Sequence, residues 1–299
     1  MSKDFRIENG QITAFISPHG AMTTAAFDLG DKKINPFYSH PWTEEEEDDS
    51  LLKYLKGDFF CLPFGAAPGE GVFDDSWVAG GVKSSRKAYA HGYSSNGVWS
   101  LDNQDASGIQ LSLDYEGDGD IEKVTRKIDL DGNWLTFTDT AVIKNAVRLP
   151  VGIHPIFRLS EKPGMMKLHL PACQDVRTYP IDTDKTSVFA NGAVCHDASE
   201  VPLRAGGTMD ATSLPLDVKT EELLLLTNVK EGRAELDNLE EGYRVILEWD
   251  ASAYRNLLLW MSNCGRDFAP WNGRNLCLGL EPITSAFDLG EEICTADNP

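Results

Sequence analysis

The sequence contains no long apolar segment. Its longest aliphatic runs, Leu223–Leu226 and Leu257–Met261, are far shorter than the about 20 residues that a membrane-spanning helix requires. The first ten residues, MSKDFRIENG, also lack the apolar stretch of a signal peptide. We therefore expect no membrane partner and a cytoplasmic location.

Basic residues are scarce relative to acidic ones. Lys and Arg together number 27 and Asp and Glu number 47, which gives a formal net charge of −20. A charge of this sign and size repels phosphate backbones and anionic lipid. Nucleic acid is therefore not an expected partner, whereas uncharged or cationic small molecules stay open.

Motifs for metals and cofactors are missing as well. The six cysteines include no CxxC pair, and no two of the six histidines have the close spacing of a local zinc site. There is no Walker loop, GxGxxG, GxSxG or HExxH. We expect reduced cysteines, no metal and no cofactor. The acidic run 44–49 and the cluster Asp114, Asp118 and Asp120 are predicted to be a helix start and a hairpin tip, with a Ca²⁺ site as the alternative.

Strand signals, in contrast, are abundant. Short runs of β-branched, aliphatic and aromatic residues alternate with turn pairs such as Asn9-Gly10, Asn96-Gly97, Asp131-Gly132 and Glu241-Gly242. In 243–249 every second residue is apolar, as in a strand with one buried face. We found no repeat and no linker, so we expect one all-β domain over residues 1–299, built of antiparallel sheets.

Helical signals are few. The best predicts a helix over Thr43–Lys56, with Thr43 as the N-cap and Glu46 completing a capping box. The acidic run would then lie in the first turns, where the helix dipole favours negative charge.

Three segments place an ionisable residue beside Gly or Pro in apolar surroundings. They contain His91 (AHGY), His154 (VGIHPIFRL) and Glu281 (LCLGLEP). We expect each at the start or end of a strand, at a sheet rim where sites are built. A lone His near aromatic residues is usually structural, but burying a carboxylate such as Glu281 is costly unless it is paired or functional. Together the three make an acid–base pair with a binding group.

These segments, in this order, resemble the aldose 1-epimerase (galactose mutarotase-like) family. The family's His-Gly, Gly-x-His-Pro-x-Phe and Leu-Glu-Pro segments match His91-Gly92, Gly152–Phe157 and Leu280–Pro282. The stretches 12–37 and 130–145 are also similar, so the resemblance covers nearly the whole chain. It implies a β-supersandwich with a sugar cleft on a concave sheet.

The resemblance also implies roles. His154 would protonate the ring oxygen of a pyranose as general acid, and Glu281 would take the proton of the anomeric hydroxyl as general base. His91 would bind the sugar. Ring opening, rotation about the C1–C2 bond and reclosure then give the other anomer. A His with a pKa of about 6.5 and a Glu with a pKa of about 4.3, raised by burial, suit this exchange near neutral pH.

Two residues of the family lack a clear counterpart. The family's Arg ahead of the first His is absent from 57–67, and Arg158 and Arg86 are the candidate substitutes. For the family's sugar-binding Asp the candidates are Glu222 and Glu221. These departures leave the identity of the sugar open.

The sequence therefore predicts an aldose 1-epimerase with a small sugar as its partner, present as a monomer or homodimer. Trp260 is a further candidate contact, because an indole offers an apolar platform to a sugar. The alternatives are a hexose-6-phosphate 1-epimerase, which needs an Arg/Lys cluster for the phosphate, and a carbohydrate-binding sandwich without catalysis.

Overall fold

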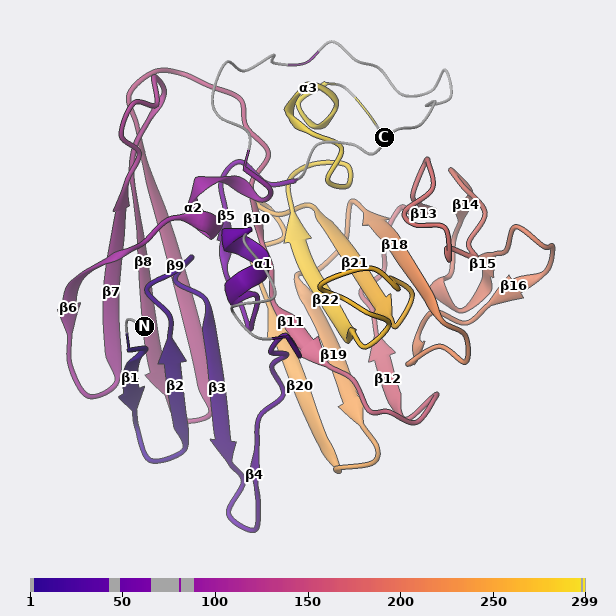
Figure 1. Cartoon of the computed structure of the whole chain (residues 1–299), viewed down its shortest axis with the longest axis horizontal. Helices are drawn as coiled ribbons and strands as arrows, with labels where there is room; N and C mark the ends of the chain where they lie inside the picture. The colour runs from indigo at the N-terminus through magenta and orange to yellow at the C-terminus, as the bar shows by residue number, and fades with distance from the viewer. Residues whose placement is uncertain (1–2, 43–48, 66–80, 82–88, 297, 299) are drawn as a thin grey trace.

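The structure is a computed structural model that describes residues 3–42, 49–65, 81, 89–296 and 298. Antiparallel β-sheets dominate it, and the described residues contain three short α-helices (Figure 1). The prediction of an all-β protein with few helices is confirmed.

Two four-stranded sheets form the amino-terminal half, on the left of Figure 1. Their orders are β1-β2-β3-β4 and β6-β7-β8-β9. The predicted turns Asn9-Gly10 and Asp131-Gly132 connect β1 to β2 and β8 to β9. The bounds are β1 Phe5–Glu8, β2 Ile12–Ile16, β3 Thr23–Asp28, β4 Lys33–Ile34, β6 Ser100–Gln104, β7 Gly108–Asp114, β8 Ile121–Asp131 and β9 Trp134–Ile143.

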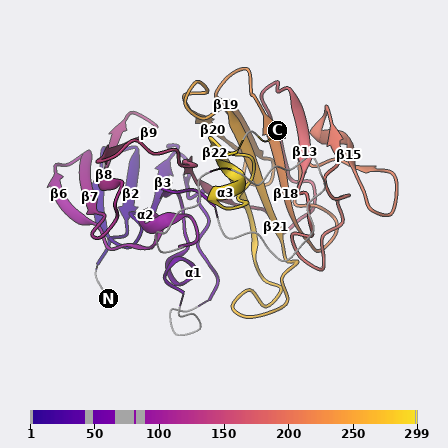
Figure 2. The same cartoon turned by 90° about the horizontal axis from the view of Figure 1, so that it is seen from above.

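An eight-stranded sheet dominates the carboxy-terminal half. Its order is β14-β13-β18-β21-β22-β10-β5, and β11 also pairs with β22. A four-stranded sheet, β17-β12-β19-β20, lies against it as a second layer, and β15 and β16 form a separate pair (Figure 2). The bounds are β5 Phe60–Cys61, β10 Gly152–Ile153, β11 Ile156–Arg158, β12 Met166–His169, β13 Asp175–Thr178, β14 Val194–Cys195, β15 Val201–Pro202, β16 Thr208–Met209, β17 Ser213–Leu214, β18 Thr220–Thr227, β19 Arg233–Asn238, β20 Tyr243–Glu248, β21 Asn256–Asn263 and β22 Leu276–Ile283.

Both faces of the eight-stranded sheet are buried. Alternate residues of β18, β21 and β22 enter two different apolar clusters. Leu224 and Leu259 belong to the cluster shared with the other sheets, whereas Leu225 and Leu258 belong to a second cluster with residues of 38–42, 51–64 and 286–293. We call the second side the covered face, and the proposed site lies there.

The short helices differ in part from the sequence prediction. Helix α1 (Ser50–Tyr54) begins at Asp49, whose side chain accepts the N–H groups of Leu51 and Leu52, so Thr43 is not its cap. Thr43 and Glu46 themselves lie outside the described residues. Helix α2 (Gly92–Asn96) ends where a hairpin turn at Asn96-Gly97 was expected, and α3 (Glu291–Cys294) lies near the carboxyl terminus.

A buried charged group joins the two halves. The guanidinium of Arg126, on β8, contacts the Asp58 carboxylate and lies 3.6 Å from Asp139 on β9. All three side chains are almost completely buried. Asp58 immediately precedes Phe59, so this group fixes the segment that leads into β5.

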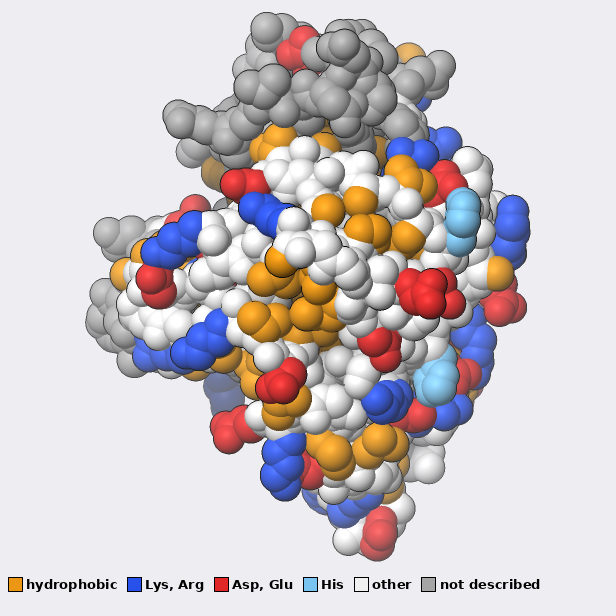
Figure 3. Space-filling view, turned by 90° about the vertical axis from the view of Figure 1, so that its right-hand side faces the viewer, with side chains coloured by type: hydrophobic (Ala, Val, Ile, Leu, Met, Phe, Trp, Pro, Cys, Tyr) orange, Lys and Arg blue, Asp and Glu red, His pale blue; other side chains and the backbone are white. Residues whose placement is uncertain are grey.

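The surface carries charges of both signs. On the side shown in Figure 3, Lys and Arg alternate with Asp and Glu around apolar side chains and form no continuous basic area. Within the described ranges, no helix has the length and apolar character needed to cross a membrane. At the predicted hairpin tip, Asp118 accepts the backbone N–H groups of Asp120 and Ile121, as expected of a turn.

Candidate active site

The structure brings three of the predicted site residues together. His154 Nε2 lies 3.3 Å from Glu281 Oε1, although 127 residues separate the two in the chain. The ring of His91 packs edge-on against that of His154, with 4.9 Å between the centroids. One imidazole–carboxylate contact and a second imidazole therefore share the covered face of the eight-stranded sheet.

His154 lies in the short break between β10 and β11. Its backbone N–H donates to the carbonyl of Phe59 at 2.9 Å, and its ring stacks on that of Phe59 at 4.5 Å. The residue is 4% exposed, and its Nδ1 atom has no hydrogen-bond partner in the part of the chain that the structure describes. The backbone and Phe59 hold the imidazole from one side and leave a nitrogen unused.

The neighbouring Pro282 suggested a sheet rim for Glu281, but the structure does not place it there. It lies within β22, directly opposite Leu258 of β21, and its residue is 1% exposed. Its Oε2 atom has no hydrogen-bond partner. Among the described residues, His154 therefore makes the one polar contact with this carboxyl group.

A glycine makes room for that carboxyl group. A Cβ atom on Gly279 would lie 2.3 Å from Glu281 Oε1 and 3.0 Å from the Cβ of Trp260. Gly279 and Glu281 are two residues apart on one strand, so their side chains share a face. The Glu281 carboxyl thus occupies space that any other residue at 279 would fill.

Burial shifts both titrations away from the charged forms. Desolvation raises the pKa of Glu281 well above its ordinary value. Desolvation, with the nearby His91, lowers the pKa of His154 well below its ordinary value. Burial therefore disfavours the charged form of both groups.

His91 is the N-cap of α2, with a φ of 57°, and its ring lies 5.1 Å from that of Phe64. Burial lowers its pKa to about 4, so the imidazole is neutral at pH 7. A neutral imidazole can donate one hydrogen bond and accept another. Its Nδ1 atom has no partner, which suits it to bind a hydroxyl group.

Trp260 lies beside the pair, with its ring 5.9 Å from that of His154. Its Nε1–H donates to Glu221 at 2.6 Å, and Ser262 Oγ donates to the same carboxylate at 2.8 Å. Arg266 completes the group at 3.3 Å from Glu221, with its guanidinium 4.8 Å above the ring of Trp271. Nothing in the sequence of its loop relates Arg266 to β18, so this pairing was not predictable from the sequence.

Glu222 is not part of this site. It lies on the opposite face of β18 from Glu221, toward the apolar cluster shared with the other sheets. Its carboxylate accepts hydrogen bonds from Ser187 Oγ, Thr220 Oγ1 and the N–H groups of Val188 and Phe189. Between the two candidates of the sequence, Glu221 therefore faces the site and Glu222 supports a loop.

Arg158 is also engaged elsewhere. Its guanidinium forms a two-pronged ion pair with Glu241, at 2.5 and 2.7 Å, and donates to the carbonyl of Asn35. It lines a surface hollow of about 400 Å³ beside Tyr38 and Arg274, away from the His154–Glu281 contact. Arg86, the other candidate, lies outside the described residues.

Among the residues that the structure describes, no cluster of three or more His, Cys, Asp or Glu side chains could hold a metal ion. The polar groups of the site are instead an acid–base pair, a neutral imidazole and a Glu–Arg pair between two indoles. This donor set fits a neutral polyhydroxylated molecule with apolar C–H faces better than it fits a cation.

Comparison with known proteins gives a consistent fold. No protein-family model and no curated protein sequence matches the chain. Solved structures do: a candidate aldose 1-epimerase from Escherichia coli K12 is similar with a TM-score of 0.65 and 16% identity, over 98% of this chain and 93% of that one. The Slr1438 protein of Synechocystis sp. PCC 6803 gives 0.64 and 17%, over 97% and 89%.

A galactose mutarotase-related enzyme from Lactobacillus acidophilus is similar with a TM-score of 0.55 and 16% identity, over 94% of this chain and 85% of that one. At such identities the likeness concerns the fold. The chain has the galactose mutarotase-like β-sandwich fold, and the resemblance seen in the sequence is confirmed at that level.

Proposed function

We propose that this protein is an aldose 1-epimerase, which interconverts the α and β anomers of an aldose. One observation carries the proposal: an imidazole and a carboxyl group, both almost completely buried, are in contact, and each keeps one atom without a partner. A purely structural pair would be expected to use those atoms. The likeness to mutarotase-like structures supports the same reaction class.

The chemistry needs one proton delivered and one removed. The ring oxygen and the anomeric hydroxyl are bonded to the same carbon, so an acid and a base that lie side by side can serve both. In ring opening, one member of the pair gives its proton to the ring oxygen while the other takes the proton of the anomeric hydroxyl, so the pair loses one proton and gains one.

The neighbouring residues supply the binding. Trp260 and Trp271, whose ring centroids lie 6.1 Å apart at 80°, offer apolar surfaces to sugar C–H groups. Glu221 and Arg266 present an acceptor and a donor beside them, and His91 adds a neutral imidazole. Neither proton step calls for a metal or a nucleotide.

The experiment is polarimetry on freshly dissolved α-aldoses and their 6-phosphates. The wild-type protein should speed the approach to the anomeric equilibrium for at least one sugar, and Glu281→Gln should abolish most of that effect. Acceleration confined to 6-phosphates would make the protein a hexose-6-phosphate 1-epimerase. If a sugar binds but the mutarotation of no sugar is accelerated, the protein is a carbohydrate-binding sandwich without catalysis.

The location and assembly belong to the same proposal. All six cysteines are free in the structure, as a reducing cytoplasm would leave them. Titration of the denatured, unreduced protein should find six thiols. Fewer would contradict a cytoplasmic location, and light scattering will decide between a monomer and a homodimer.

A further inference from the structure

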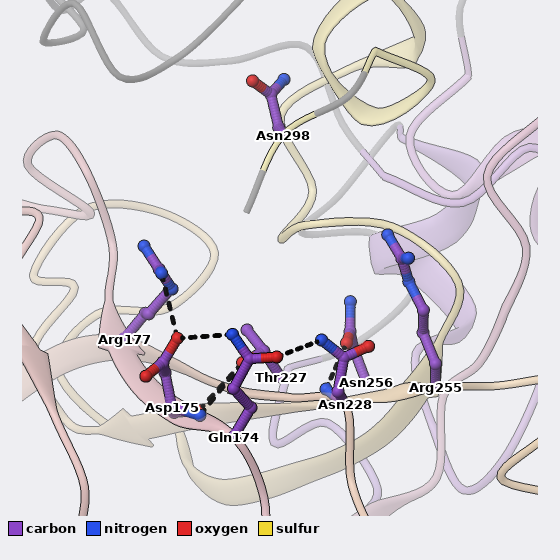
Figure 4. Close-up of a pocket in the computed structure, with 8 residues that line it drawn as sticks. All are labelled: Gln174, Asp175, Arg177, Thr227, Asn228, Arg255, Asn256 and Asn298. Carbon is purple, nitrogen blue, oxygen red and sulfur yellow. Dashed lines mark hydrogen bonds and ion pairs between the residues drawn. The ribbon is translucent and has the colours of Figure 1, made fainter.

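A second polar pocket lies on the covered face, where β13 and β21 begin and β18 ends. Figure 4 shows Arg177 and Arg255 rising on either side of it, with a floor of amide side chains between them and Asn298 above. Its volume is about 120 Å³. That is roughly the volume of four waters, too small for a hexose but sufficient for a small ion with its water.

Asn228 already occupies two acceptor atoms of the floor. Asn228 donates through its side chain to Gln174 Oε1 at 2.9 Å and through its backbone to Asn256 Oδ1 at 3.0 Å. Gln174 in turn donates to Asp175 Oδ2 at 3.3 Å. Each side-chain amide nitrogen of Gln174 and Asn228 keeps a second hydrogen, so the floor presents donors to the pocket.

The arginines add further donors and positive charge. Arg177 uses one nitrogen on Asp175, at 3.1 Å, and its buried Nε has no partner. Arg255 forms no ion pair within the described part of the chain. Two guanidinium groups against one carboxylate leave the pocket with a net charge of about +1, although the whole chain carries −20.

We propose that this pocket binds a small oxyanion, a phosphate or the carboxylate of a small organic acid. Planar guanidinium groups match the oxygen edges of both. The pocket is separate from the proposed sugar site. Arg177, Leu225, Leu258 and Glu281 form one row across four strands, so about 14 Å and two apolar side chains lie between Arg177 and Glu281.

The test is calorimetric titration of the full-length protein with inorganic phosphate, and in a second arm with acetate, at constant ionic strength. We expect saturable binding of at least one of the two anions. The melting temperature should then rise with the logarithm of that anion's concentration. Arg255→Gln should weaken binding at least tenfold, and because Arg255 is exposed and unpaired this variant should keep its fold. Arg177→Gln should act in the same direction.

Arg148→Gln is the matched control, because it removes the same charge from an exposed arginine outside the pocket. It should bind like the wild type. Equal binding by Arg255→Gln and Arg148→Gln, or no saturable binding of either anion, would overturn the proposal. A preference for phosphate or for acetate identifies the source of the anion. The mutarotation rate of Arg255→Gln should equal that of the wild type. The anion-binding proposal and the epimerase proposal can therefore be contradicted independently of each other.

Discussion

Glu222 and Glu281 are two buried carboxyl groups on the same sheet, and they have opposite surroundings. Glu222 points into the apolar core between the sheets and accepts hydrogen bonds from two hydroxyl and two backbone N–H groups. Glu281 points to the covered face, where His154 is its one polar partner and Oε2 has none. Glu222 is fully hydrogen-bonded, whereas Glu281 keeps an oxygen atom without a partner among the described residues.

The difference distinguishes a carboxyl group with a structural role, Glu222, from one suited to catalysis, Glu281. A carboxylate with several donors is fully hydrogen-bonded and fixes the loop that supplies those donors. A desolvated carboxyl with one partner contributes little to stability, but burial raises its pKa and so favours the form that carries an exchangeable proton. The experiments below test that separation, from the largest expected effect to the smallest.

Replacing Glu281 should produce the largest change. Glu281→Gln and His154→Asn should each lower the mutarotation rate by about 10²–10⁴-fold, since a general acid or base is lost. The double variant should be little slower than the slower single variant, because the two groups act as one unit. Initial polarimetric rates measure these effects. A wild-type rate in Glu281→Gln would show that Glu281 takes no part in catalysis.

Gly279→Ala should act on Glu281 without replacing it. The new Cβ meets Glu281 Oε1, so the carboxyl must move, and a misplacement of about 1 Å can cost roughly 10²-fold in rate. In the Glu281→Gln background the same change should cost far less. Gly119→Ala, where a Cβ meets nothing within 4 Å, is the control and should leave the rate unchanged. Equal losses in both backgrounds would indicate general disruption instead.

Glu222→Gln should reverse the pattern. An amide cannot accept from all four donors, so the free energy of unfolding should fall by about 3 kcal/mol, while the rate per folded molecule stays at the wild-type value. Glu281→Gln, measured by the same urea titration, should change the unfolding free energy by less than about 1 kcal/mol. Two equal stability losses would show that both carboxyl groups are structural.

The acid dependence of stability should be the smallest effect. His91 has a folded-state pKa of about 4, below its unfolded value of about 6.5. As the pH falls below 6.5 the unfolded chain binds the proton first, so stability should fall by up to about 2 kcal/mol between pH 6.5 and 5. His91→Asn should show less of this loss in urea titrations at the two pH values. An identical slope in both proteins would contradict the burial of His91.

Much of the fold was predictable because its signals are local. The alternation in 243–249 and the turn Glu241-Gly242 gave the β19–β20 hairpin, since one face of β20 is exposed. The predicted start of helix α1 at Thr43 was wrong. Asp49 is an equally good N-cap residue, and sequence alone does not rank the two.

The site was predictable only where its residues carry a motif. His91, His154 and Glu281 came from short recognisable segments, and the structure brings them together. The assignment between Glu221 and Glu222 could not be made, because β18 is buried on both faces and its apolar residues show no alternation. Arg266 reaches Glu221 from a loop 45 residues further along the chain, and only tertiary structure reveals that pairing.

The charged group formed by Arg126, Asp58 and Asp139 has a consequence for engineering. Asp58 is followed by Phe59, whose carbonyl and ring both hold His154, so the β8–β9 hairpin sets the position of an imidazole that it never touches. Substitutions in that hairpin should tune the pH optimum while every residue near the sugar stays the same. The same tie means that neither half, expressed alone, should carry activity.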